Sequence, residues 1–579
     1  MAAPEHDGGR GRARHDLTVA GRGAPAGPPT PGPVRIPRQR SAPPAGVDRD
    51  SAGDLVAGLL ARPLGQVSPS VYETSRVTVL APWLGGQPQR IRFLLAQQRP
   101  DGGWGGPDGY ALVPTLAATH ALLHLLAGTG DGTGTGDGTG IGRAELAAAV
   151  RRGLAASWRL VHRAAVPVPD TPAIEIIVPS LVALLTEQLR ALRSRPVPEL
   201  ASWAGTPGLP APAGLDAAPL GQIRAALGAG APVPAKLLHS LEVLHGLEVA
   251  ARVRELRPGG LGTVGASPAA TASWLATYGD RAGGPGRRAA GYLDAVALHH
   301  GGPVPSVVPV TAFERAWVLS TLTHAGLARG VPAALLDDLA AGLGPDGSPG
   351  GAGLPPDADT TSVVLRMLAR HGRPADPAVL DGYDTGGHFC TWPGERTASA
   401  TTNAHVLEAL AYRTGTGTGT GPGYRRTVGR IAGWLTDEQR PDGSWTDKWH
   451  ASPYYATGTC VLALHRAGPV ATGPGPAGAV RSAVRWLVAT QRPDGCWGRW
   501  DGTAEETGYA LIALVAAGAG HPAAAQAIGR GAAWLHAAAG QRPDPPLWHD
   551  KDLYLPAAVV RAVVLAAGEL ATRHLRRSP

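Results

Sequence analysis

Apolar residues recur along this chain with the spacing of one face of an α-helix. A clear example spans residues 111–128 and reads ALVPTLAATHALLHLLAG, with a terminal glycine that stops the helix. Runs that alternate apolar and polar residues between hairpin turns are missing from the sequence. With 81 glycines and 55 prolines, the helices must be short and often interrupted. The pattern therefore predicts an all-α fold.

A second pattern is a repeated turn, in which a helix ends at Gln-Arg-Pro-Asp-Gly and a tryptophan follows the glutamine by six positions. The copies place these two residues at Gln98 and Trp104, Gln439 and Trp445, and Gln491 and Trp497. A looser fourth copy spans residues 534–548. Proline fixes φ and Asp-Gly permits a left-handed position, so the repeats predict stacked helix pairs. We favour a structural role for the repeated Gln and Trp.

Residues 355–372 read PPDADTTSVVLRMLARHG and place two acids at the start of a predicted helix. The prolines stop whatever precedes them, and Gly372 provides a C-terminal stop. Asp357 and Asp359 have two readings here. Aspartate is a preferred N-cap, because its side chain accepts backbone N–H groups that are free in the first turn. A pair of carboxyls can also perform acid chemistry, and the rest of the sequence must decide.

The chain has 579 residues, of which 44% are hydrophobic, and this is enough for two or more domains. Residues 1–50 lack apolar periodicity and are predicted to be disordered. The glycine- and threonine-rich stretches at 128–142 and 414–423 are predicted loops. No uninterrupted apolar run reaches the ~18 residues of a membrane span, and no signal-peptide core opens the chain. We therefore expect a cytoplasmic protein without an integral membrane segment.

The net charge is +8, and all but three of the 53 basic residues are arginines. The lysines are Lys236, Lys448 and Lys551. No basic cluster is interleaved with aromatic residues, so we do not expect nucleic-acid binding. The cysteines Cys390, Cys460 and Cys496 fit neither a disulfide framework nor a zinc-ligand pattern.

At its repeats the chain resembles the terpene cyclase superfamily, and other segments resemble the bacterial class II (protonation-initiated) members. SVYETSR at 70–76 resembles the family segment Ser-x-Tyr-Asp-Thr-Ala, with Glu73 in place of aspartate. DTPAIEIIVPSL at 170–181 resembles the segment Gly-Phe-Glu-x-x-x-Pro-x-Leu. Further family-like blocks span 236–242, 267–275, 313–319, 389–410 and 551–556. Their order and spacing, from about residue 68 to about residue 560, make the resemblance specific.

This resemblance implies a fold of two α/α-barrel domains, one inserted into the other. The β domain would combine residues 51–75 with residues 300–579 and carry the acid. The γ domain would span residues 76–299, and the active site would lie between the two domains. Residues 1–50 would precede both domains as a disordered tail.

The resemblance also implies roles for single residues. The family signature is Asp-x-Asp-Asp, whose middle aspartate is the general acid, and this position corresponds to Asp359. Asp357 is the first acid, and Thr360 replaces the third, as in the Asp-x-Asp-Thr variants of related bacterial cyclases. Asn403 resembles the family asparagine that hydrogen-bonds the acid.

Protonating an alkene requires a carboxyl group that is not ionised, although a free aspartate has a pKa of about 3.9. Burial against apolar walls disfavours the anion, and a neighbouring carboxylate disfavours it further. A helix N-terminus favours the anion by ~0.3–2 kcal/mol, whereas full burial shifts a carboxyl by about 3–5 pKa units, or roughly 4–7 kcal/mol. We therefore expect burial to keep the acid protonated in a dry site.

A carbocation also needs walls that are electron-rich but not nucleophilic, and aromatic faces stabilise cations by ~0.5–2 kcal/mol each. The candidates in family-like blocks are Trp317, Trp392, Tyr455 and Tyr509. Packing of the helical core is the alternative role for each of them. His405 and His388 are candidates for the final deprotonation, with a satisfied core histidine as the alternative.

The diphosphate of a substrate needs cationic partners, for which all three lysines, Lys236, Lys448 and Lys551, are candidates. A solvent-exposed lysine is the alternative for each. Glu175 resembles a family acid that helps to hold Mg²⁺, and a partly buried capping glutamate is its alternative. A homodimer is left open beside a monomer.

The resulting expectation is cyclisation of geranylgeranyl or farnesyl diphosphate to a bicyclic, copalyl- or drimenyl-type diphosphate. With three phenylalanines in the chain, the pocket is expected to hold fewer aromatics than a triterpene cyclase needs.

A squalene- or hopene-type cyclase and a non-catalytic helical-toroid binding protein stay open as alternatives. Class I chemistry needs an Asp-Asp-x-x-Asp motif, and the adjacent pair Asp337–Asp338 continues as Leu-Ala-Ala. A protein prenyltransferase subunit would need a zinc site, which the cysteines do not supply.

Overall fold

The computed structural model describes residues 49–128, 140–162, 168–247, 261–415, 422–468, 474–538 and 543–577. Apart from its last two residues, the predicted disordered tail lies outside these ranges. So do most of the predicted loops 128–142 and 414–423. The described residues belong to one compact unit.

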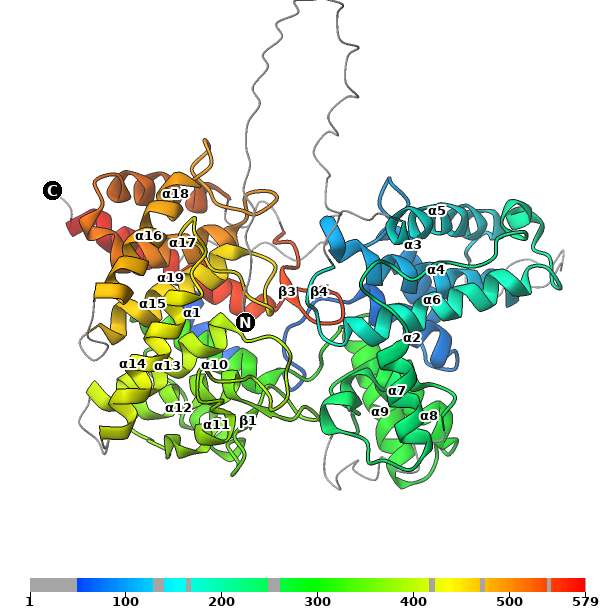
Figure 1. Ribbon diagram of the computed structural model, residues 1–579, viewed down its shortest axis with the longest axis horizontal. Helices are drawn as coiled ribbons and strands as arrows, with labels where there is room; N and C mark the ends of the chain where they lie inside the picture. Colours follow the sequence, from blue (N-terminus) through cyan, green and yellow to red (C-terminus); the bar gives the residue numbers. More distant parts are fainter. Residues whose placement is uncertain are drawn as a thin grey trace, which may run out of the picture. The chain divides into compact units, whose positions relative to one another are not determined.

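The described chain is built from α-helices, with short 3₁₀-helices (η) and two-residue strands between them (Figure 1). The first part contains α1 (Arg49–Gly58), α2 (Val71–Leu80), α3 (Gln87–Ala96), η1 (Asp108–Ala111), α4 (Leu112–Gly128), α5 (Arg143–Val161), α6 (Ile174–Ala191), η2 (Pro198–Trp203), α7 (Ala218–Gly228), η3 (Ala235–Leu244), α8 (Pro268–Tyr278) and α9 (Gly284–His299). The second part contains α10 (Thr311–His324), α11 (Ala333–Ala341), β1 (Ser348–Pro349), β2 (Pro356–Asp357), α12 (Ala358–Arg370), η4 (Pro377–Tyr383), α13 (Ala400–Gly415), α14 (Pro422–Asp437), α15 (Pro453–Ala467), α16 (Pro474–Ala489), α17 (Ala504–Ala517), η5 (Gly518–Gly520), α18 (Ala524–Ala538), β3 (Trp548–His549), β4 (Leu553–Tyr554) and α19 (Ala557–Arg577). Two antiparallel pairs, β1 with β2 and β3 with β4, are the strand ladders of the described residues. The predicted all-α class is confirmed.

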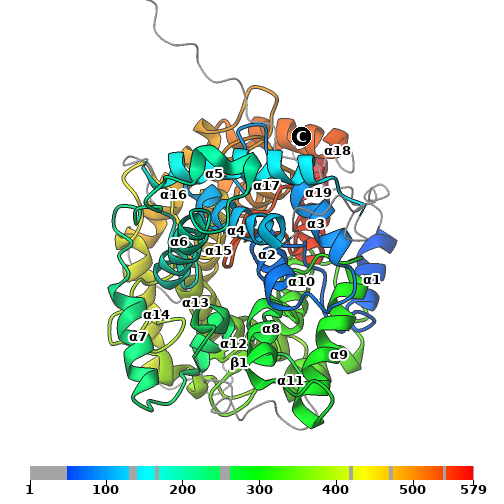
Figure 2. The same cartoon turned by 90° about the vertical axis from the view of Figure 1, so that its right-hand side faces the viewer.

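The helices close into two rings. In the C-terminal ring, each of α10, α12, α13, α15, α17 and α19 packs on the next, and α19 packs back on α10. The helices α11, α14, α16 and α18 pack outside this ring. In the N-terminal ring, α2, α4, α6, η3 and α8 follow one another, and α8 returns to α2 (Figure 2, where this ring faces the viewer). This double layer of helices is the α/α-barrel architecture that the sequence predicts.

The buried apolar residues fall into separate cores. One core runs from Val71 to Val308 and fills the N-terminal ring. Two others fill the C-terminal ring, and one of these includes Ala52 and Leu55 of α1. This distribution is expected if the N-terminal ring is inserted between α1 and the C-terminal ring, because α1 shares a core with helices that follow residue 307. The exact domain boundaries at residues 75 and 299 stay predictions.

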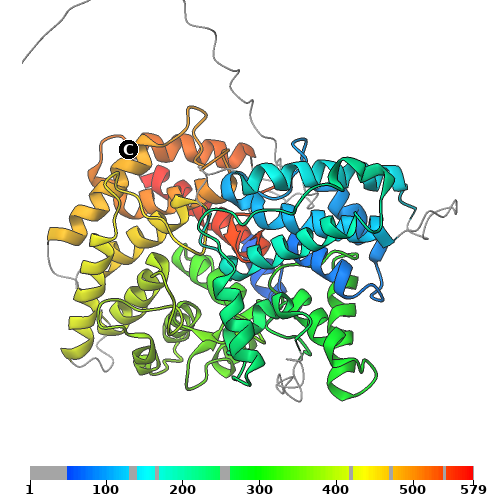
Figure 3. The same ribbon diagram turned by 45° about the vertical axis from the view of Figure 1, so that its right-hand side comes forward.

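The C-terminal segment joins the two rings. In Figure 3 its red ribbon lies between the blue-to-green helices and the yellow-to-orange helices. Asp552 accepts hydrogen bonds from the Ser70 hydroxyl (2.7 Å) and the Tyr72 N–H (3.0 Å), next to α2. Two positions earlier, Asp550 Oδ1 lies 2.8 Å from His239 Nε2 in η3. The His549 N–H donates to Trp449 O (2.9 Å) in the C-terminal part, so the hairpin β3–β4 is held by both parts of the fold.

One described helical segment, from Asp108 to Gly128, is long and apolar enough to cross a membrane by length and composition. However, 78% of its apolar window is buried inside the protein. It packs against α2, α5 and α6 within the N-terminal ring. This is the environment of a core helix, so the prediction of no integral membrane segment agrees with the described residues.

The repeated turns have the structural role that we predicted. In the first copy, Gln98 Nε2 donates to Gly102 O (3.0 Å) in the turn and to Ala149 O (2.9 Å) in α5, the second α-helix after the turn. The Trp104 indole is buried and donates to Leu94 O (2.6 Å) in the helix that ends there. The same bonds recur at Gln439 with Trp445 and at Gln491 with Trp497. The glutamine of the fourth copy lies outside the described residues.

Candidate active site

A cavity of about 560 Å³ is lined by residues from both rings and is named here the substrate cavity. Ile176 and Leu227 come from the N-terminal part, whereas Phe313, Asp359 and Trp548 come from the C-terminal part. The predicted site residues that line it are Asp357, Asp359, Thr360, Trp392, Lys236, Lys448 and Glu175. The predicted residues outside its lining are Asn403, Trp317, Tyr455, Tyr509 and Lys551.

The two acids lie where β2 ends and α12 begins. Asp357 is the N-cap of α12, since its Oδ1 accepts the Thr360 N–H (2.6 Å) and its Oδ2 accepts the Thr360 hydroxyl (3.0 Å). Asp359 lies in the first turn and is 9% exposed. Both readings of the sequence therefore apply, one to each residue. Asp357 caps the helix, and Asp359 is left to face the cavity.

The hydrogen-bond partner of Asp359 is His405, not Asn403. His405 Nδ1 and Asp359 Oδ1 share a hydrogen bond of 2.6 Å between α13 and α12. Asn403 is fully buried, accepts the Phe389 N–H (2.8 Å) and donates to Phe389 O and Ser399 O (both 2.9 Å). Its side-chain amide is therefore occupied by hydrogen bonds to backbone atoms. The expected hydrogen bond between Asn403 and Asp359 is therefore wrong. The sequence analysis considered His405 only as a candidate for the final deprotonation or as a core histidine.

Burial, followed by the nearby charge of Asp359, raises the pKa of Asp357 to about 7, and the two hydrogen bonds from Thr360 oppose this shift only in part. At neutral pH Asp357 is therefore partly protonated, so the carboxyl next to Asp359 does not carry a full negative charge.

A change of Asp357 to asparagine is expected to alter the pH dependence of stability. The folded pKa of about 7 lies above the unfolded value, so Asp357 stabilises the fold at low pH and this contribution is lost as pH rises through about 7. Asp357→Asn keeps an oxygen for the Thr360 N–H but removes the titration. Its free energy of unfolding, relative to the parent, should rise by ~1.4 kcal/mol per pH unit from about pH 4 to about pH 7. Denaturant titrations across this range test it, and a constant difference would contradict the assignment.

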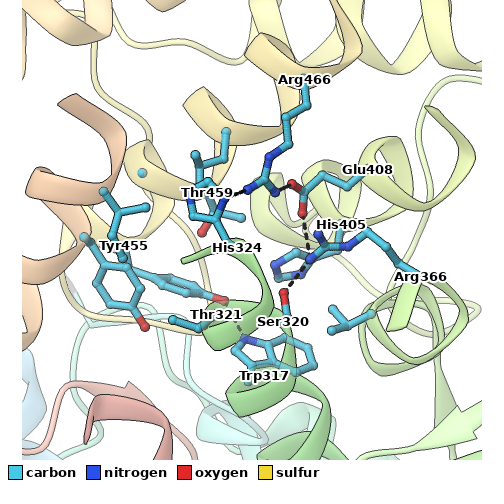
Figure 4. Close-up of a pocket in the computed structure, with 15 residues that line it drawn as sticks. Trp317, Ser320, Thr321, His324, Arg366, His405, Glu408, Tyr455, Thr459 and Arg466 are labelled. Carbon is cyan, nitrogen blue, oxygen red and sulfur yellow. Dashed lines mark hydrogen bonds and ion pairs between the residues drawn. The ribbon is translucent and has the colours of Figure 1, made fainter. Parts of the chain in front are cut away.

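The aromatic candidates lie in two layers. Trp392 lines the substrate cavity, and its ring packs edge-on against Trp449 at 5.2 Å. Trp317, Tyr455 and Tyr509 lie deeper, inside the C-terminal ring (Figure 4). The residues between them and the cavity are Phe313, Trp548 and Tyr554, which sequence reasoning did not single out. Trp548 contacts Phe313 (5.3 Å) and Tyr455 (4.8 Å), so the wall and the deeper layer support each other.

The three lysines have three different environments. Lys236 is exposed and lines the cavity. Lys448 also lines it, donates to Thr397 O (2.7 Å) and forms an ion pair with Glu395. Lys551 is wholly buried outside the cavity, and its role in diphosphate binding was predicted wrongly.

Lys551 holds a buried charge cluster. Its ammonium group donates to Glu73 Oε1 (2.6 Å), Glu242 Oε1 (2.9 Å) and Ser267 Oγ (2.8 Å), which uses all three of its protons. Tyr72 also donates to Glu242 Oε1 (2.7 Å). Lysine as a residue type suggests an exposed cation, but here it is structural.

Glu175 lies in the first turn of α6, where its Oε2 is 3.4 Å from Arg396 Nη2. No group of three or more His, Cys, Asp or Glu side chains that could hold a metal occurs in the described ranges. Mg²⁺, however, usually takes one or two carboxylates and completes its shell with water and substrate phosphates. A lone Glu175 at a basic rim fits that mode of binding.

His388 does not approach the acid. Its ring stacks on Trp434 at 5.3 Å, outside the lining of the substrate cavity. The adjacent acids Asp337 and Asp338 lie on α11 and pair with Arg373 and Arg315. The one adjacent aspartate pair therefore has no part in the substrate cavity.

Together, the two rings, the apolar cavity between them and a carboxyl at the start of an inner helix define a cyclase of the protonation type. Residues 396–556 match the family model of the squalene-hopene cyclase C-terminal domain. The chain is 43% identical to an ent-copalyl diphosphate synthase of Streptomyces sp. (strain KO-3988), over 89% of this chain and 95% of that protein. It is 35% identical to a terpentedienyl-diphosphate synthase of Kitasatospora griseola, over 89% of this chain and 99% of that protein.

The solved structure of ent-copalyl diphosphate synthase from Streptomyces platensis matches with a TM-score of 0.83 and 44% identity. The match covers 90% of this chain and 99% of that chain. The chain therefore belongs to the class II terpene cyclases, and it is an enzyme similar over nearly its full length to bacterial copalyl-type diphosphate synthases.

Proposed function

We propose that this enzyme protonates the terminal alkene of geranylgeranyl diphosphate and cyclises the chain to a bicyclic, copalyl-type diphosphate that keeps its diphosphate. The observation that carries the proposal is Asp359, a carboxyl at the wall of a mostly apolar cavity with Lys236, Lys448 and Arg396 in the same lining. A volume of about 560 Å³ lies within the ~300–1,000 Å³ of ligand cavities. The names of the relatives support a C20 substrate.

The residues of the site explain how the first step would proceed. The Asp359 hydroxyl gives its proton to the alkene, and the His405 bond fixes the carboxyl in place while negative charge develops on it. Apolar side chains such as Ile176, Ile223 and Leu354 line the cavity and exclude water that would quench a cation. The faces of Phe313 and Trp548 give the cation electron-rich neighbours.

Retention of the diphosphate is supported by the composition of the cavity. Ionising that group would need a clustered carboxylate–metal site, and the described part of the chain shows no such cluster. The cationic residues at the rim bind diphosphate oxygens as charge-assisted partners. Lys448 and Arg396 each have a carboxylate neighbour, Glu395 and Glu175 respectively, so substrate binding would rearrange these pairs.

The assay that tests this function incubates the purified enzyme separately with geranylgeranyl diphosphate, farnesyl diphosphate and squalene, with Mg²⁺ present. Products are analysed by gas chromatography and mass spectrometry before and after phosphatase treatment. A bicyclic C20 alcohol that appears only after phosphatase is the expected result. A cyclised product from squalene, a C20 hydrocarbon released without phosphatase, or no turnover of any substrate would contradict the proposal.

Mg²⁺ is proposed as a partner of the diphosphate, held on the protein by Glu175. When bound, it would neutralise charge on the diphosphate and orient it. Glu175→Gln is expected to raise the Mg²⁺ concentration for half-maximal activity by about tenfold or more. Glu187→Gln, an exposed glutamate on the same helix, is the matched control and should leave this concentration unchanged. An equal Mg²⁺ dependence in both variants would contradict the proposal that Glu175 holds Mg²⁺.

The cytoplasmic location and the homodimer are proposed only as further expectations of this function. Cell fractionation tests the first, and analytical ultracentrifugation of the purified chain tests the second.

A further inference from the structure

Trp548 forms part of the wall of the substrate cavity, and its ring is held from behind by a buried glutamate. The indole N–H donates to Glu505 Oε1 (2.7 Å) at the start of α17. Trp548 is 2% exposed, and the side chain of Glu505 is fully buried. Glu505 is absent from the lining of the substrate cavity. It can therefore act on a substrate only through a residue of the wall, such as Trp548.

The place of Glu505 in the first turn of α17 has an ordinary explanation, because acids stabilise helix N-termini. Its neighbours already fill that role. The Thr503 hydroxyl accepts the Glu506 N–H (3.0 Å) and donates to Glu506 Oε2 (2.8 Å). Glu506 Oε1 also accepts the Arg499 N–H (2.8 Å). The start of α17 is thus capped without Glu505, and the carboxyl of Glu505 bonds Trp548 instead.

The surroundings of Glu505 indicate that its carboxyl is uncharged. His450 Nε2 approaches Glu505 Oε1 (3.2 Å), but His450 Nδ1 accepts the Ser452 N–H (2.9 Å). That bond places the single proton of a neutral imidazole on Nε2, and burial lowers the pKa of His450 to about 3. Among the described residues, no lysine or arginine pairs with Glu505. Burial therefore raises the pKa of Glu505 to about 8, and the bond from Trp548 opposes this shift only in part.

Other polar groups around Glu505 favour the same uncharged form. Glu505 Oε2 is buried without a hydrogen-bond partner in the described part of the chain, as is the hydroxyl of the nearby Tyr509. An unpaired oxygen costs far more to bury in a carboxylate than in a carboxylic acid. Asp544 adds a second buried acid, and burial followed by Glu505 raises the pKa of Asp544 to about 7. The group that bonds Trp548 is therefore a neutral acid with one acceptor oxygen in use.

The bond from the indole N–H fixes the orientation of the Trp548 ring. The ring also contacts Phe313 (5.3 Å), Tyr455 (4.8 Å) and His450 (5.1 Å between ring centroids). Aromatic rings pack in several arrangements, whereas indole has a single N–H donor, so its bond selects one orientation. A ring stabilises a cation only when its face lies within about 6 Å. The direction in which Trp548 is held therefore decides whether its face meets the cavity.

We propose that Glu505, as an uncharged acid, is a positioning residue that fixes the Trp548 ring in the wall of the substrate cavity. The inference rests on the proposed function, in which the face of Trp548 stabilises the carbocation. Because only an acceptor oxygen of Glu505 is used, a neutral amide should replace the acid, whereas an apolar side chain should not. Without the bond the ring can turn, which takes an electron-rich face away from the cation and gives water access to it.

The test is a double-mutant cycle of Glu505→Leu and Trp548→Phe, assayed with geranylgeranyl diphosphate by steady-state kinetics and product analysis. We expect Glu505→Leu to lower kcat by about 2–30-fold, the rate equivalent of one aromatic face beside a cation. KM should stay unchanged, and monocyclic or hydroxylated products should form a larger share. Trp548→Phe keeps a ring but has no N–H to bond Glu505. Adding Glu505→Leu to Trp548→Phe should therefore lower kcat by less than about twofold further.

Two further variants separate positioning from a general structural role. Glu505→Gln keeps an acceptor oxygen for Trp548 and His450, so it should recover most of the parent kcat and the parent product. Glu438→Leu makes the leucine change at an exposed glutamate just after α14, and it should leave kcat and products unchanged. Thermal unfolding establishes that each variant folds.

Equal losses from Glu505→Leu with and without Trp548→Phe would overturn the inference, because Glu505 would then act independently of Trp548. Parent-like kcat and products in Glu505→Leu would also overturn it. If Glu505→Leu does not fold, Glu505→Gln carries the test, and a loss of tenfold or more in that variant would show that a carboxylate is required. A parent enzyme that forms no cyclised product is a distinguishable result, which contradicts the proposed function and removes the basis of the inference.

Discussion

Asp359→Asn is expected to lower kcat with geranylgeranyl diphosphate by about 10³–10⁴-fold, because an amide has no acidic proton to give to an alkene. Asparagine is nearly isosteric with aspartate, so the cavity and the contact with His405 should persist. KM should change little, since the diphosphate binds elsewhere. Steady-state kinetics with phosphatase-coupled product analysis measures both constants.

The matched control for this variant is Asp337→Asn, which makes the same chemical change on α11, where the side chain of Asp337 is 66% exposed. It should retain parent activity within about twofold, because exposed surface substitutions have small effects. Circular dichroism and thermal unfolding establish that both variants fold. Substantial turnover by a folded Asp359→Asn would show that another group donates the proton.

Lys551→Met is expected to destabilise the protein by about 3–5 kcal/mol, because it leaves two buried carboxylates without their cation. Lys551, Glu73 and Glu242 all have fully buried side chains. The loss should be smaller at pH 5 than at pH 8. Burial already raises the pKa of Glu73 to about 7 even with Lys551 present, so without the lysine Glu73 should protonate more readily, and the stability of the variant should fall as pH rises.

Chemical denaturation at the two pH values measures this effect. Lys236→Met is the control, since Lys236 is exposed, and its stability should stay within ~0.5 kcal/mol of the parent. Adding Glu73→Gln and Glu242→Gln to Lys551→Met should recover much of the loss, because neutral groups are cheaper to bury. A loss that is equal at both pH values, or no recovery in the triple variant, would contradict the assignment of Lys551 as a buried counter-ion.

The features that follow from local chemistry could be predicted from the sequence. Helical periodicity and glycine stops place α4 and α12 correctly, since both depend on neighbours along the chain. The Asp357 cap is local too, because its partner Thr360 is three residues away. The repeated Gln and Trp bond within the turn, to the helix that ends there and to the second α-helix after it, and their spacing is visible in the sequence.

The features that depend on how helices cross could not be predicted. Asn403 and His405 are two positions apart on α13, so they face directions about 200° apart, and only one of them can meet Asp359. The packing of α13 on α12 brings His405, and not Asn403, into contact with Asp359. Lys551 meets Glu73 and Glu242, which are 478 and 309 positions away, and lysine chemistry alone does not reveal that burial.

The wall of the cavity illustrates the same limit. Phe313 precedes Trp317 by one helical turn on α10, and both fit a family-like block, yet only Phe313 reaches the cavity. Trp548 belongs to the loose fourth repeat, where a structural role was the natural expectation. The β3–β4 hairpin instead carries it to the site, and a hairpin of two-residue strands gives no signal in the hydrophobic pattern.

The central claim is that Asp359 delivers a solvent-derived proton to the substrate alkene. The most direct measurement is the mass of the product formed from unlabelled geranylgeranyl diphosphate by enzyme equilibrated in D₂O. The account predicts one deuterium per bicyclic product, on the ring methylene carbon that was the CH carbon of the original terminal alkene, and about 10³-fold less product or lower still from Asp359→Asn in the same time. A bicyclic product without deuterium, or with unchanged yield from that variant, would contradict it.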